Sequence, residues 1–375
     1  MASAQRSARL DVHIVDVERR HLQAVVYPDY LSHFGRHSIN GNCSMLSRRK
    51  LLSAAMASSA VSLGLAARAS KAADDYPNRV IHLIVGYATG GNVDIPARLF
   101  APELQRILGQ PVIIENRPGA SGVPASEAVS RAAADGYTII WGTSASHSVS
   151  VVAMAPLPFD PVKDFAPITL ISEDPNVIIA ANSFPAADSI DTFLAYVKAH
   201  PGTPIGTAGP ATSGRFAVAL MKPKMGVELT VVPYKSTGPL LTDLAGNHIP
   251  LGITAASTAV PFIKEKAIRA IAMTSLKRSR VLPEIPTFDE TVSKGFDAVA
   301  WSALFAPPGT PDPIIKKLNA AMKEVSELPA IKKWFDESGL EVPMSSPAEL
   351  TSFMKADIEK WVQVAKENNL KIDMR

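Results

Sequence analysis

From Asn78 onward, short apolar runs alternate with amphipathic segments along the chain. The first runs have the length and composition of buried strands and lie at 79–86, 111–115 and 137–142. Between the first two, the segment 93–109 repeats apolar residues at helical spacing and places Ala97, Phe100, Leu104 and Leu108 on one face. This alternation is typical of an α/β fold with mainly parallel sheets.

A second series of the same kind follows after residue 166. The segment 166–182 predicts one or two strands, and further strands are expected at 203–208, 229–234, 249–254, 267–275 and 296–308. Helices are expected between them and over the last 65 residues, with Ser189 and Ser346 as N-caps. About ten strands approach the usual limit of one sheet, so two domains are expected.

The chain therefore divides into 73–176 as the first part of domain 1, 177–296 as domain 2, and 297–375 as the rest of domain 1. The hinges are expected near Asp174–Val177 and near Asp297–Ser302.

The N-terminal part has the features of an export signal. An Arg-Arg pair at 48–49 precedes the apolar run 53–67, which is too short to span a bilayer, and "ARASKA" offers a cleavage site after Ala72. The pair indicates a twin-arginine (Tat-like) signal over 45–72 and a periplasmic location. The alternative is an ordinary buried helix starting at Arg48. Because such signals begin a chain, translation is expected to start at Met45, with 1–44 an upstream extension.

The leader also changes the charge of the protein. Residues 1–72 hold 10 Lys and Arg against 4 Asp and Glu, so the remaining 28 and 31 give the exported chain a net charge of about −3 instead of +3. No basic stripe remains, which argues against nucleic acid as a partner. The one cysteine, Cys43, lies before the exported chain, which therefore needs no disulfide.

Common catalytic and cofactor motifs are missing from the exported chain. Its four histidines are not paired at i, i+4, and it has no cysteine, so neither a metal site nor a cofactor is expected. "GYATGG" is not GxGxxG, no GK[ST] follows a glycine loop, and GxSxG does not occur. The protein is therefore not expected to be an enzyme.

Two local groups of polar residues are candidates for a catalytic role. Ser146 stands beside His147, but neighbours in sequence seldom have the geometry for proton transfer, so His147 is expected to be a loop or helix-start residue. The carboxylates of "SEDPNV" and "FDPVKD" are expected to be solvated turn residues.

Three strand-to-helix turns are rich in small residues: "GYATGGNVD", "GTSASHS" and "TAGPATSGR". Each leaves backbone N–H groups free at a helix start, where the helix dipole favours an anion. In α/β sheets such turns gather where ligands bind. We expect the turns to face one another and to grip a small carboxylate.

Asp94, in the first of these turns, would repel an anion if it pointed at the ligand. We expect it to brace the loop, with Arg98 four residues on as its partner. The alternative is contact with an amino or hydroxyl group of the ligand.

From Tyr76 to about Asp373 the sequence resembles the Bug (TctC-like) family of periplasmic solute-binding proteins, which are receptors of tripartite tricarboxylate transporters. The resemblance is carried by "NRPGASGVPASEAVSRAAADGYTII" (116–140), "YATGGNVDIPAR", "VPYKSTGPLLTDLAGNHI", "MTSLKRSRVLPEIPTFDE" and "FAPPGTPDPIIKKLN". It implies a two-domain periplasmic binding fold of the type II, Venus-flytrap kind, with two crossovers and mainly parallel sheets.

The resemblance also implies a function and a set of site residues. The implied function is capture of a mono- or dicarboxylate by a monomer that presents it to a membrane permease. The implied ligand-binding residues are Thr89, Gly90, Gly91, Asp94, Thr143, Ser144, Ser146, Gly209, Thr212, Ser213 and Thr254. Arg215, Ser236 and Thr254 depart from the family pattern and bear on which ligand is bound. A sensory partner of a membrane kinase and a periplasmic enzyme acting on a carboxylate are the alternatives.

Overall fold

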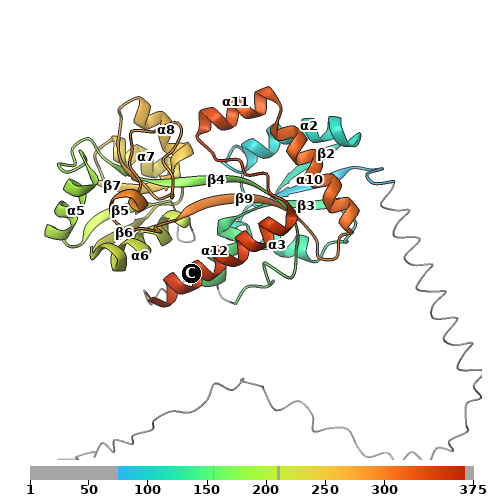
Figure 1. Cartoon of the computed structure of the whole chain (residues 1–375), viewed down its shortest axis with the longest axis horizontal. Helices are drawn as coiled ribbons and strands as arrows, with labels where there is room; N and C mark the ends of the chain where they lie inside the picture. The colour runs from blue at the N-terminus through green and yellow to red at the C-terminus, as the bar shows by residue number, and fades with distance from the viewer. Residues whose placement is uncertain (1–74, 155, 209–211, 368–375) are drawn as a thin grey trace, which may run out of the picture. The chain divides into compact units, whose positions relative to one another are not determined.

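Two long strands carry the chain across the molecule in opposite directions. β4 (Ala166–Ala180) and β9 (Val299–Ala306) are paired antiparallel, from Ala166 opposite Ala306 to Pro175 opposite Val299. From Asn176 onward, β4 pairs with β7 and β8 instead. Each end of β4 therefore belongs to a different lobe, and Figure 1 shows β4 and β9 running side by side between two groups of helices and strands.

The computed structural model describes residues 75–154, 156–208 and 212–367, all of which lie in one compact unit. The predicted export signal, the start at Met45 and Gly209 lie outside the described residues. Within the described ranges, no helix is long and apolar enough to cross a membrane.

The first lobe is built by the elements that precede β4 and by the helices that follow β9. They are β1 (Ile81–Val85), α2 (Asp94–Leu108), β2 (Val112–Asn116), η1 (Ala120–Gly122), α3 (Val123–Ser130), β3 (Thr138–Thr143), the π-helix η2 (Ala145–Val149), α4 (Ser150–Ala153), α10 (Asp312–Ser326), α11 (Pro329–Ser338) and α12 (Pro347–Glu367).

The second lobe is built by the elements between β4 and β9. They are α5 (Ile190–Ala199), β5 (Thr203–Thr207), α6 (Ser213–Met225), β6 (Leu229–Pro233), α7 (Thr237–Ala245), β7 (Leu251–Ala255), α8 (Ala256–Lys264), β8 (Arg269–Met273) and α9 (Phe288–Thr291).

Eight strands of the described residues form one hydrogen-bonded path in the order β2-β1-β3-β9-β4-β7-β5-β6, and a ninth, β8, pairs with β4 off this path. β1 pairs in parallel with β2 and β3, and β5 pairs in parallel with β6 and β7. Every antiparallel pair involves β4 or β9, because these strands enter each lobe from the other one. The predicted α/β two-domain fold with two crossovers is confirmed.

The hydrophobic pattern placed the helices and their ends correctly. Ala97, Phe100, Leu104 and Leu108 of α2 are all buried, and Gly109 ends that helix in the left-handed conformation. The Ser189 side chain caps α5 by accepting from the N–H of Thr192. Ser346 accepts from the N–H of Glu349 at the start of α12.

The segment 166–182 contains a single strand where one or two were expected. No loop interrupts it at Asp174–Val177, and the chain returns between the lobes as β9, directly after Asp297 and Ala298. Both predicted hinges are therefore places where a strand passes from one lobe to the other.

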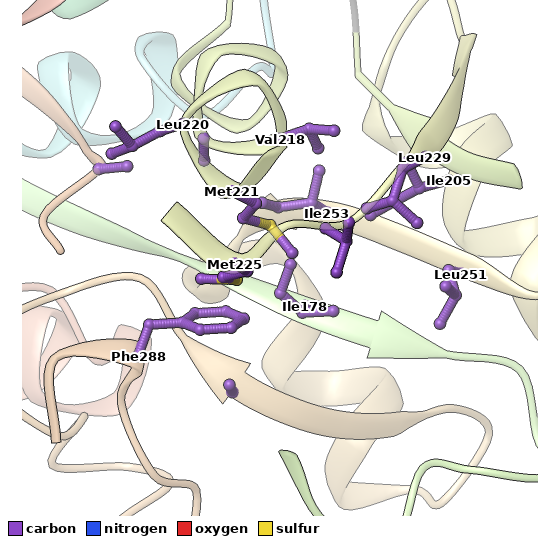
Figure 2. Packing of buried hydrophobic residues seen from close by; sticks show 14 of the residues in the cluster. Ile178, Ile205, Val218, Leu220, Met221, Met225, Leu229, Leu251, Ile253 and Phe288 are labelled. Carbon is purple, nitrogen blue, oxygen red and sulfur yellow. The ribbon is translucent and has the colours of Figure 1, made fainter. Parts of the chain in front are cut away.

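The core of the second lobe is formed by apolar residues of its sheet and of α6. Figure 2 shows Ile178, Ile205 and Ile253 of the strands facing Met221 of α6. The last helix also ends in this core: the ring of Trp361 on α12 packs edge-on against Phe216, with 5.6 Å between centroids. The first half of α12 packs in the first lobe through Leu350 and Met354, so this helix spans both lobes.

Candidate functional site

The loop between β1 and α2 is held in place by one buried carboxylate. Asp94 Oδ2 accepts hydrogen bonds from the N–H of Gly90 and from Nε of Arg98, both at 2.7 Å. Its Oδ1 accepts from Nδ2 of Asn116 at 2.7 Å. Gly90 has φ of +79°, a conformation that favours glycine. The loop shape therefore depends on a glycine at 90 and on Asp94.

The pKa of Asp94 follows from these contacts. Burial alone would raise it, but the hydrogen bonds from Arg98, Gly90 and Asn116 outweigh burial and lower the pKa below its usual value. Asp94 is therefore ionised at neutral pH, at the N-terminal end of α2, where the helix dipole also favours a negative charge. This geometry is that of the expected loop brace.

The turn after β3 continues directly into the π-helix η2. Ser146 Oγ lies 2.8 Å from Nδ1 of His147, so these sequence neighbours form a hydrogen bond, and His147 lies in the short helix that follows β3, as predicted. Both side chains are buried, and the imidazole stacks on the ring of Phe305, with 4.5 Å between centroids and 7° between planes. Burial lowers the pKa of His147 to about 3, so the ring is neutral at neutral pH.

The His147 ring is part of the core. Its Nε2 atom is buried without a hydrogen-bond partner among the described residues, so no carboxylate orients the ring. A serine and a histidine alone lack the third group that positions the base in a hydrolytic triad. The pair therefore holds the start of η2 in place.

The start of α6 carries two of the predicted site residues, Thr212 and Ser213. The Thr212 side chain accepts from the N–H of Arg215 and so caps α6. Ser213 Oγ accepts from Nδ2 of Asn176, at 3.0 Å, and Nδ2 also donates to the carbonyl of Ala298 at 2.7 Å. Because Asn176 and Ala298 belong to the two crossing segments, this network ties the start of α6 to the passage between the lobes.

Turns of both lobes line one cavity of about 740 Å³. Six of the predicted site residues lie in its wall: Gly90, Thr143, Ser144, Thr212, Ser213 and Thr254. Thr89, Gly91, Asp94 and Ser146 do not line it. Arg215 does not line it either, and it is partly buried rather than fully solvated.

Other residues of the wall were not among the predicted site residues. Tyr87 donates to the carbonyl of Ser121 at 3.0 Å and shares a 2.7 Å hydrogen bond with Thr143 Oγ1. Lys235 follows β6 and is the one lysine or arginine among the described residues of the wall. The further members of the wall include Asn92, Ser172, Asp174, Asn176, Ser236, Thr237, Ser257, Thr258, Trp301, Ser302 and Trp334.

The polar segment around Asp174 differs from its prediction. The prediction of a solvated turn at "SEDPNV" is wrong, because Glu173 and Asp174 lie inside β4 and both are partly buried. A strand that passes between two lobes can carry polar residues in a run that resembles a turn, because the cavity replaces solvent there. Burial raises the pKa of Asp174 to about 6, although the hydrogen bonds from Ser257 oppose that rise.

The site contains donors and little that could perform chemistry. No group of three or more His, Cys, Asp or Glu among residues 75–154, 156–208 and 212–367 could hold a metal ion. The wall instead contains the hydroxyl-bearing residues Thr143, Ser144 and Ser213 and one lysine, Lys235. Such an arrangement binds a small polar molecule between two lobes.

A two-lobed α/β fold with a binding cavity between its lobes defines the class of periplasmic solute-binding proteins. The chain belongs within this class to the tripartite tricarboxylate transporter receptor (TctC) family, whose pattern it matches over residues 96–370.

Known proteins agree with this assignment. The chain is 32% identical to BugT of Bordetella pertussis over 311 residues, which is 82% of this chain and 94% of BugT. It resembles the structure of MatC from Rhodopseudomonas palustris with bound malate, at 33% identity, TM-score 0.68, and coverage of 77% and 99% of the two chains. It also resembles an R. palustris protein solved with adipate, at 32% identity, TM-score 0.72, and coverage of 79% and 99%.

Proposed function

We propose that this protein is a periplasmic receptor that captures a small mono- or dicarboxylate between its lobes and delivers it to the permease of a tripartite tricarboxylate-type transporter. The observation that carries the proposal is the cavity wall, in which both lobes place serine and threonine residues together with Lys235. Structural neighbours solved with malate and adipate support the same ligand class.

In this proposal the two lobes are two domains that close on the ligand. Residues 73–176 and 297–375 form domain 1 and 177–296 form domain 2, with the hinges where β4 and β9 pass between them. Closure on the ligand brings the turn at Gly90 toward the turn at Ser213, and the closed form presents a new surface to the permease. A sensor kinase in place of the permease would use the same closed form.

A thermal-shift screen of the purified protein against a carboxylate panel tests the proposal. A ligand present at 100 times its Kd adds roughly 2.7 kcal/mol to the free energy of unfolding, so Tm rises clearly. Neutral and cationic solutes of similar size are the control. A rise with these solutes and none with any carboxylate would refute the proposal.

The same screen addresses the enzymatic alternative, although neither Ser146 nor His147 lines the cavity. Each stabilising carboxylate is incubated with the protein and recovered. An unchanged ligand supports a receptor, whereas its conversion that stops on Ser146→Ala would identify an enzyme.

A further inference from the structure

One carboxylate stands in the wall of the cavity without a positive partner. Asp174 lies at the point where β4 leaves β9 and enters the second lobe. Its Oδ2 accepts from Oγ of Ser257 at 2.5 Å, and its Oδ1 accepts from the N–H of the same residue at 3.2 Å. No lysine, arginine or histidine of the described residues forms an ion pair with Asp174. Both Asp174 and Ser257 line the cavity.

The carboxylate keeps free capacity for hydrogen bonds. An ionised carboxylate has about four lone-pair positions and can only accept. Ser257 supplies the two donors that the described residues give Asp174, which leaves about two of these positions open on a residue that lines the cavity. A partly buried carboxylate gains when a further donor reaches it, because burial has removed much of its water.

The same carboxylate penalises an anionic ligand that brings only acceptors. A ligand carboxylate placed against Asp174 meets a like charge, which is costly at low local dielectric. The donor of the described wall best suited to a ligand carboxylate is the ammonium group of Lys235. The described wall therefore carries one cationic and one anionic side chain, Lys235 and Asp174.

We propose that Asp174 determines specificity within the site by selecting small carboxylates that also carry a hydrogen-bond donor, a hydroxyl or an ammonium group, and that this donor binds the Asp174 carboxylate. The proposal rests on the proposed function, since it concerns which carboxylates the receptor prefers. Asp174 contacts the ligand directly, and Ser257 fixes the orientation of its carboxyl group.

If Asp174 had a purely structural role, the expected result would differ. Asp174 bonds to the first turn of α8, whose N-cap residue, Ala255, has no side chain that could cap. If capping were its whole contribution, replacing Asp174 would weaken all ligands by the same factor. The ratio between matched ligands therefore separates the two roles.

The test measures Kd by isothermal titration for three sets of ligands that differ only at carbon 2: propionate, lactate and alanine; succinate, malate and aspartate; glutarate, 2-hydroxyglutarate and glutamate. In the set that binds, the wild type is expected to prefer the hydroxyl or the ammonium member over the unsubstituted one by about 10-fold or more. The hydroxyl and ammonium arms show which donor is used.

Asp174→Asn removes the charge at nearly constant volume and adds a donor. We expect the preference to fall to about 3-fold or less, with weaker binding of the substituted member and tighter binding of the unsubstituted one. Asp289→Asn is the matched control, because Asp289 is a buried carboxylate bonded to Lys294 and Gly295 away from the cavity. It should keep the wild-type ratio.

Three outcomes are decisive. An equal affinity of the wild type for all members of the binding set, or an unchanged ratio in Asp174→Asn, overturns the role of Asp174 and leaves the receptor function standing. Binding of no carboxylate in any set refutes the proposed function itself. A ratio lost in Asp174→Asn and kept in Asp289→Asn supports the inference.

Discussion

Asp94 and Asp174 carry the same side chain in two different surroundings, one behind a turn of the cavity wall and one in the wall itself, with opposite consequences. Asp94 receives three donors, one of them the guanidinium of Arg98, and does not line the cavity. Asp174 receives donors from Ser257 alone and lines the cavity. The pKa of Asp94 is lowered, whereas burial raises that of Asp174 to about 6.

The number and charge of the donors explain the difference. A carboxylate whose acceptor positions are filled by the protein stabilises the ionised form and holds its loop in shape. When the protein supplies too few donors, the hydrogen bonds do not fully offset the desolvation penalty of the buried carboxylate, and the folded protein is destabilised to that extent. That cost falls when a ligand supplies the missing donor, which makes an incompletely bonded residue suited to recognition.

The largest expected effect comes from removing the fully bonded carboxylate. Asp94→Ala loses three hydrogen bonds of roughly 1 kcal/mol each, so we expect a loss of about 3 kcal/mol in the free energy of unfolding. The Gly90 turn also loses its anchor, and the affinity for the ligand should fall. Urea denaturation at pH 7 and isothermal titration measure the two effects.

The pH dependence of Asp94 has a definite sign. Its pKa in the folded protein lies below the usual 3.8, so the unfolded chain binds more protons in that range. The stabilisation is complete above pH 3.8 and is lost as the pH falls through the folded pKa. The difference between wild type and Asp94→Ala should therefore shrink only in acid. A constant difference down to pH 2 would contradict the ionised brace.

Asp174→Asn should change stability in the opposite direction. The folded pKa of about 6 lies above 3.8, so the folded protein binds more protons, and stability falls as the pH rises from 3.8 to 6. At pH 7 the variant should be more stable than the wild type by about 2 kcal/mol. A shift of about two pKa units corresponds to roughly 3 kcal/mol, and solvent screening of the partly exposed carboxylate reduces this value. Below pH 4 the two should agree. Denaturation curves at pH 4 and pH 7 check this, and a variant less stable at pH 7 would show that Asp174 is a structural brace like Asp94.

The fold could be predicted from the sequence because it depends on the periodicity of hydrophobic residues and on the residues that cap the helices. The helix face of Ala97, Phe100 and Leu104 and the N-cap at Ser189 follow from local spacing, and the structure confirms them. The single strand 166–180 was less certain, because Glu173, Asp174 and Pro175 interrupt its apolar pattern. Their polarity reflects the cavity and the passage between lobes, which local patterns do not describe.

Within the site, the sequence identified the turns but only some of the residues that face the cavity. Gly90 and Gly91 are adjacent, yet only Gly90 has positive φ and lines the cavity. Asp174, Lys235 and Trp301 come from distant segments that meet only in the folded protein. Which side of a turn faces a ligand depends on tertiary packing, as the inward-turned Asp94 shows.

The smallest expected effect tests why the pKa values of Asp94 and Asp174 differ. The cause is either the number of hydrogen-bond donors that each carboxylate receives or the positive charge of one donor, Arg98. Ser257→Ala removes the hydroxyl donor of Asp174 and leaves only the N–H, whereas Asn116→Ala removes one of three donors of Asp94 and leaves Arg98 and Gly90. Loss of a donor that bonds the ionised form raises a pKa, so the pKa of Asp174 should rise above 6 by about 1 unit, equivalent to about 1.4 kcal/mol. Asp94 should stay ionised throughout the neutral range, because the guanidinium remains. Carbon-detected NMR titration of the two carboxyl groups measures both values, and equal shifts in the two variants would mean that the charge of Arg98 contributes nothing to the difference between the two aspartates.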